Sequence, residues 1–117
     1  ITSMGPFDYW PTGYGFEYFY GFLAGEASQY EPTLTRNTTP VTEHLPKGYH
    51  LTDDIATDAI RWLREQKAYA PDKPFFMYWA PGASHGPHQV MKEWADKYKG
   101  ARRLQCRARH RRDREAG

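Results

Sequence analysis

The chain is poor in cysteine and has no long apolar run, and each shortage excludes a class of protein. Cys106 is the only cysteine among the 117 residues, so no disulfide can form within the chain. No apolar stretch approaches the roughly 20 residues that a membrane-spanning helix needs, and no secretory leader is recognisable. We therefore expect at most one domain and no membrane partner. The chain begins at Ile1 without an initiator methionine, and we expect further sequence upstream.

Charge is distributed unevenly between the two ends of the chain. Residues 101–117 contain seven arginines and two acids, whereas residues 1–100 contain nine Lys and Arg against twelve Asp and Glu. An arginine-rich segment without an apolar period cannot build a core. We therefore interpret residues 1–100 as the folded body and residues 101–117 as a disordered or frameshifted tail. Such a tail could neutralise nucleic-acid phosphates, but we do not expect a nucleic-acid partner.

The first half of the body is aromatic and then irregular. Residues 7–22 contain nine aromatic side chains interrupted by glycine and proline, which predicts loops with at most a short strand over residues 16–22. We expect these rings to pack at the edge of a core rather than to form a flat sugar- or base-binding platform. Residues 24–50 are rich in Gly, Pro, Thr and Asn and predict a long irregular connection.

An amphipathic helix is predicted from Asp53 to about Gln66. Thr52 is a suitable N-cap, and acidic residues in the first turn complement the helix dipole. Arg61 and Glu65 are spaced to form an i,i+4 ion pair on the polar face. A second, shorter helix is expected from Met91 to Tyr98, with aromatic side chains on its inner face.

A buried strand is predicted over Phe75–Ala80. The run is continuous, apolar and aromatic, as is typical of a strand covered on both faces of a parallel sheet. Pro81 ends it, and His85 follows on a tight loop. Open α/β sheets place ligands just past the carboxyl ends of their strands. The order helix, strand, loop, helix predicts an α/β fold, and His85 is the first candidate functional residue.

Other candidate sites are weaker. His88 is better interpreted as an ordinary loop histidine, and a zinc site made of His85, His88 and either His50 or His44 lacks the usual ligand spacing. We also interpret the acids of the predicted helix as dipole partners rather than metal ligands. The sequence Asn-Thr-Thr at residues 37–39 matches a glycosylation acceptor, a pattern that is frequent by chance.

Four stretches resemble a middle segment of bacterial arylsulfatases, in the sulfatase branch of the alkaline-phosphatase-like superfamily. They are GPFDYWPTGYGFEYFYGF at 5–22, GYHLTDD at 48–54, DKPFFMYWAPGASHGPH at 72–88 and EWADKYKG at 93–100. The resemblance implies part of a sulfatase fold, with an incomplete sheet and flanking helices, and hydrolysis of small sulfate esters in an intact parent. It implies that the parent uses formylglycine and calcium, in either the periplasm or the cytoplasm.

By the same resemblance, His85 matches the family histidine that touches the sulfate and carries charge or a proton at the leaving oxygen. It is therefore the predicted catalytic and substrate-binding residue. The family's nucleophile motif, Cys/Ser-x-Pro/Ala-x-Arg, is absent, and Cys106 is followed by Arg-Ala-Arg instead. The family's Asp-Asn calcium ligands and two lysine-containing elements are missing too. No residue of this chain is therefore expected to bind calcium.

The resemblance and these departures predict an arylsulfatase fragment that is inactive alone. A phosphodiesterase or phosphonate hydrolase of the same superfamily is the alternative enzyme. A non-catalytic binding fragment with a basic tail is the alternative outside catalysis. A piece of a larger sheet leaves apolar faces uncovered, so we expect marginal stability or oligomerisation.

Overall fold

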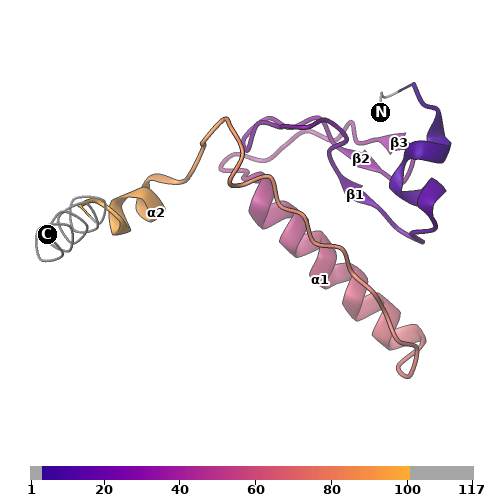
Figure 1. Ribbon diagram of the computed structural model, residues 1–117. Helices are drawn as coiled ribbons and strands as arrows, with labels where there is room; N and C mark the ends of the chain where they lie inside the picture. The colour runs from indigo at the N-terminus through magenta and orange to yellow at the C-terminus, as the bar shows by residue number, and fades with distance from the viewer. Residues whose placement is uncertain (1–3, 101–117) are drawn as a thin grey trace, which may run out of the picture.

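The computed structural model describes residues 4–100, and the predicted tail at 101–117, with Cys106, lies outside them. Two short 3-10 helices, η1 (Phe7–Tyr9) and η2 (Pro11–Tyr14), come first. A small sheet follows, and then the long helix α1 (Leu51–Tyr69) and the short helix α2 (Lys92–Lys97). Figure 1 shows the sheet and the 3-10 helices on one side of α1, with α2 set apart from both.

Helix α1 confirms the predicted helix but is longer at both ends. His50, not Thr52, occupies the N-cap position, and the hydroxyl of Thr52 instead donates a 3.2 Å hydrogen bond to Gln29 Oε1. Leu51, the first helical residue, is completely buried, which explains why the helix begins there. The predicted Arg61–Glu65 ion pair is present at 2.9 Å.

The sheet is antiparallel and is made of strands other than the one predicted over Phe75–Ala80, and no parallel pairing occurs among the strands of the described residues. Strand β2 (Thr35–Arg36) lies between β1 (Tyr20–Gly21) and β3 (Thr39–Pro40). Asn37 begins the two-residue turn between β2 and β3 with φ 54°, a left-handed conformation that asparagine tolerates. Its backbone and side chain both bond to Phe19, at 2.8 and 3.0 Å, so Asn37 has a structural role in this turn.

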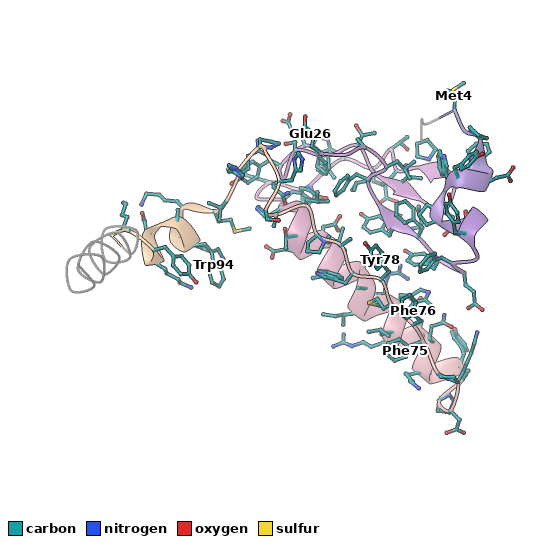
Figure 2. The ribbon with its side chains drawn as sticks, viewed as in Figure 1. Met4, Glu26, Phe75, Phe76, Tyr78 and Trp94 are labelled. Atoms are coloured by element: carbon teal, nitrogen blue, oxygen red, sulfur yellow. The ribbon has the colours of Figure 1, made fainter. Side chains whose placement is uncertain are left out.

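The predicted buried strand over Phe75–Ala80 is not formed. The segment is extended, but none of residues 4–100 pairs with it as a neighbouring strand. It turns back after α1 and runs along that helix, with the side chains of Phe76 and Tyr78 each 74% exposed (Figures 1 and 2). A continuous apolar run predicts a buried strand only where other strands flank it in a sheet. The described residues supply no such neighbouring strand.

The core is small and lies between the N-terminal segment, the sheet and the start of α1. Its fully apolar members are Trp10, Leu34 and Leu51. Trp10 packs edge-on against Phe7 with ring centroids 4.8 Å apart. Helix α2 contributes nothing to this core: Trp94 and Tyr98 are exposed, so the predicted inner face of the second helix is wrong. With so little buried apolar surface, polar contacts carry much of the attachment of α1 to the sheet.

Tyrosines preceding and within β1 attach the sheet to α1. The hydroxyl of Tyr20 donates a 2.6 Å hydrogen bond to Asp54, which also accepts one from Tyr49 at 2.8 Å. One turn further along α1, Asp58 accepts a hydrogen bond from Tyr18 at 2.7 Å. Two of the acids predicted to serve the helix dipole, Asp54 and Asp58, thus also accept hydrogen bonds from tyrosine hydroxyls.

Candidate functional site

His85 lies in an exposed loop that follows the extended segment, as the chain order predicted. Its N–H donates a 3.0 Å hydrogen bond to the carbonyl of Gly82, which closes a turn, and its Nδ1 lies 2.8 Å from the carbonyl oxygen of Gly86. The ring itself is mostly exposed. Because no strand forms before it, the predicted position at the rim of a parallel sheet is not reproduced in residues 4–100.

Three contacts dock the loop of residues 82–89 onto the segment of residues 22–29. A Cβ added to Gly82 would lie 3.0 Å from the ring of Phe22, so the backbone of Gly82 lies close to the end of that ring. In the middle, His85 Nδ1 lies 3.6 Å from a carboxylate oxygen of Glu26, a contact that becomes an ion pair when the imidazole is protonated (Figure 2 labels Glu26). At the far end, Gln89 Oε1 accepts a 2.7 Å hydrogen bond from the N–H of Gln29.

Gln29 connects this loop to α1. The residue is 2% exposed, and its carbonyl accepts a 2.7 Å hydrogen bond from the N–H of Leu51, the first residue of the helix. Its side-chain oxygen accepts the hydroxyl of Thr52. Sequence reasoning missed Gln29, Gln89 and Glu26, because they lie in segments predicted to be irregular and no spacing rule links positions 60 residues apart.

The other candidate histidines do not gather around His85. His88 is exposed, and His50 packs edge-on against Tyr30 with ring centroids 5.5 Å apart. Within residues 4–100, no three side chains of His, Cys, Asp or Glu are placed to hold a metal ion. The acids of α1 are bonded to tyrosines and arginines instead, so the described residues do not fit the calcium site of the predicted family.

The tyrosines at these acids are strongly perturbed. Burial is the main cause that raises the pKa of Tyr20 and of Tyr49 well above the ordinary value of 10, and the hydrogen bond that each gives to Asp54 adds to it. The pKa of Tyr18 is raised by burial and by its bond to Asp58. These groups stay neutral at physiological pH, which makes them hydrogen-bond donors in the packing of α1 rather than proton-transfer groups.

An aromatic groove has a volume of about 890 Å³. It lies between α1, residues 14–22 and the extended segment, where the rings of Phe16 and Phe76 are 6.2 Å apart. His85 does not line it. The groove is therefore separate from the loop that carries His85.

The family model for sulfatases matches residues 2–114. The chain belongs to the sulfatase family. The uncharacterized sulfatase YdeN of Escherichia coli (strain K12) is 32% identical over 89 residues, which are 75% of this chain and 15% of the relative. The sulfatase chain thus spans a small part of the length of this curated relative. No solved structure matches this chain.

Sulfatase membership supports the family part of the resemblance: the alkaline-phosphatase-like fold class, sulfate-ester chemistry in the family generally, and a partial α/β architecture. The family match extends over the whole loop that carries His85. Among the residues whose placement is described, no helix has the length and apolarity to cross a bilayer.

Proposed function

We propose that this sulfatase chain is an internal fragment of an arylsulfatase catalytic domain, which supplies His85 to the sulfate pocket of an intact parent and is inactive alone. The observation that carries the proposal is the exposed imidazole of His85 on a loop that lies inside the family match and is docked at both ends. An imidazole presented in this way can reach a small anionic substrate without rearrangement of the core.

The chemistry that we assign to His85 is modest and specific. In sulfate-ester hydrolysis the S–O bond to the leaving group breaks, and the electron pair stays on the ester oxygen. A protonated imidazole beside that oxygen stabilises the developing charge and can give it a proton. The carboxylate of Glu26 lies 3.6 Å from Nδ1 and forms an ion pair with the ring when the imidazole is protonated.

The remaining parts of the reaction would come from the parent outside this chain. Formylglycine would supply the attacking hydrate, and calcium would neutralise sulfate oxygens. Covalent catalysis needs nucleophile, proton donor and charge clamp in one pocket, and this chain supplies only the second. Residues 1–100 would then belong to the catalytic domain, and the arginine-rich residues 101–117 would form a tail with no part in the pocket.

The proposal is tested first on the chain itself. The purified 117-residue chain, assayed with 4-nitrophenyl sulfate and calcium, should release no 4-nitrophenol above the buffer rate. Turnover that disappears in His85→Ala would show that the fragment is active and that the proposal of inactivity is wrong. Sequencing the DNA on both sides should reveal an in-frame Cys/Ser-x-Pro/Ala-x-Arg upstream.

The role of His85 is tested in that longer protein. His85→Ala should lower kcat/KM for 4-nitrophenyl sulfate by about 10²- to 10⁴-fold, the range expected for loss of a proton-transfer group. His88→Ala, three residues further along the same exposed loop, is the matched control and should change it by less than about threefold. Equal effects of the two substitutions would contradict a specific role for His85.

A further inference from the structure

We propose that Gln89 is a positioning residue for His85, and that it acts through Gln29. The amide oxygen of Gln89 accepts two hydrogen bonds from the facing segment: one from the N–H of Gln29 at 2.7 Å and one from the hydroxyl of Ser28 at 3.2 Å. We call this pair of bonds the glutamine latch. It joins residues about 60 positions apart in the sequence, so it is a tertiary contact and not a local turn.

The latch closes one end of the loop, and Gly82 closes the other. The close approach of Gly82 to the ring of Phe22, and to the side-chain nitrogen of Gln29 at 3.7 Å from the added Cβ, leaves room for no larger residue without a shift. His85 lies between these two anchors. A loop held at both ends to the same segment has far fewer accessible conformations than one held at a single end.

Through Gln29 the latch also connects the loop to helix α1. The backbone carbonyl of Gln29 and its side-chain oxygen both accept hydrogen bonds from the first turn of α1, from Leu51 and Thr52. Because Leu51 is completely buried, this end of α1 is fixed by the core. The core therefore sets the position of the His85 loop through Gln29, which is bonded to α1, and Gln89, which is bonded to Gln29.

The consequence for catalysis rests on the proposed function of His85. A group that donates a proton to a leaving oxygen has to be held within about 0.5 Å of the productive geometry. The ring of His85 is mostly exposed, and its contacts are with Gly86 of its own loop and Glu26 of the facing segment, so the anchors of the loop decide where the ring lies. Gln89 touches neither substrate nor reacting atoms, and its contribution is positional.

The test uses the isotopically labelled chain and measures amide hydrogen exchange by NMR. In Gln89→Ala, the N–H of Gln29 loses its acceptor and should exchange roughly fivefold to tenfold faster. The N–H of Val41, bonded to the carbonyl of Leu34 at 2.9 Å in the sheet region, should keep its rate. The nuclear Overhauser contact between the ring of His85 and the side chain of Glu26 should weaken in the same variant.

Rescue and control variants separate positioning from general stability. Gln89→Glu keeps an acceptor oxygen at the same reach and should restore the slow exchange of Gln29 and the His85–Glu26 contact. Gln66→Ala makes the same chemical deletion on the half-buried face of α1 and should alter neither. If Gln89→Ala does not fold, Gln89→Asn, which shortens the side chain by one methylene, is measured instead and should show the same selective loss.

Two results would overturn the proposal: unchanged exchange at Gln29 in the deletion variant, or equally faster exchange at Gln29 and Val41. Failure of Gln89→Glu to restore protection would do the same. None of these measurements uses a substrate, so they are independent of the proposed function. Full activity of a His85→Ala parent enzyme would refute that function and leave the latch standing.

Discussion

The hydroxyl of Tyr18 donates a 2.7 Å hydrogen bond to the carboxylate of Asp58, and this contact joins the segment before β1 to the middle of α1. The carboxylate of Asp58 belongs to a residue that is only 7% exposed. It is compensated by Arg61 at 2.7 Å and by Arg36 at 3.5 Å. Few apolar side chains are buried among residues 4–100, so this paired carboxylate is one of the contacts that join the helix to the sheet, and loss of one partner would leave the others uncompensated.

Asp58→Ala should therefore be strongly destabilising. Removal of the carboxylate leaves the hydroxyl of Tyr18 without its acceptor and takes one ion-pair partner from Arg36 and from Arg61, at a cost of about 2 kcal/mol after allowance for the half-exposed arginines. Urea unfolding followed by far-UV circular dichroism measures the loss. Glu65→Ala removes the exposed partner of the same Arg61 and should cost less than about 0.5 kcal/mol. Comparable losses would show that the burial of Asp58 is unimportant.

Stability should fall at alkaline pH because of Tyr20 and Tyr49. Burial, with the bonds to Asp54, raises the pKa of both above the unfolded value of 10. Their contribution is complete below about pH 10, where both states are protonated, and it declines as the unfolded state loses protons first. Urea unfolding at about pH 8 and about pH 11 measures the decline, and tyrosinate absorbance follows the titration.

The double variant Tyr20→Phe, Tyr49→Phe is the control for this pH dependence. It lacks both hydroxyls, so its stability should fall less between the same two pH values, although it starts lower at neutral pH. If the double variant loses as much stability at alkaline pH as the unsubstituted chain, the effect belongs to other groups.

Gly82→Ala should loosen the loop that carries His85. The new Cβ would lie 3.0 Å from the end of the Phe22 ring, which is tighter than most real contacts, so the ring or the loop must give way slightly. Overpacking of this kind costs about 1 kcal/mol. Gly25→Ala adds the same methyl group where nothing lies within 4 Å and should be close to neutral. Thermal unfolding and the exchange rate of the Gln29 amide measure the difference between the two variants.

Tyr78→Lys should reduce self-association of the chain. Phe75–Ala80 is extended, uncharged and largely exposed, which is the pattern of segments that pair with further copies. A lysine in the middle of it places a charge where two copies would meet. Tyr69→Lys changes an even more exposed tyrosine, 88% accessible at the end of α1, and should leave association unchanged. Sedimentation velocity over a concentration series decides between the two outcomes.

The sequence predicted the elements whose cause is local. Helix α1 follows from the spacing of its apolar residues and from the acids of its first turn, and the Arg61–Glu65 pair follows from helical geometry alone. The end of the helix was placed too early, because nothing before Pro71 stops it. Strand β1 lies within residues 16–22, where the sequence allowed a short strand, whereas β2 and β3 have two residues each, too few to produce a period, and were not predicted.

What failed depended on partners elsewhere. The buried strand over Phe75–Ala80 was inferred from composition, but burial needs neighbouring strands, and residues 4–100 provide none beside it. The order of residues around His85 was predictable, and its docking through Gln29 and Gln89 was not. A hydrogen bond between a backbone N–H and a distant side chain leaves no pattern in the sequence.

The extended segment also has a consequence for proteolysis of the chain. Proteases bind their substrates as extended strands, and Phe75–Ala80 already has that shape, with aromatic residues on display and its backbone unpaired within residues 4–100. A chymotrypsin-like enzyme would cut there before it reached α1. After such a cut, only non-covalent contacts would hold the piece that carries His85 to the N-terminal piece. That piece would dissociate once the hydrogen bond of Gln89 to Gln29 broke.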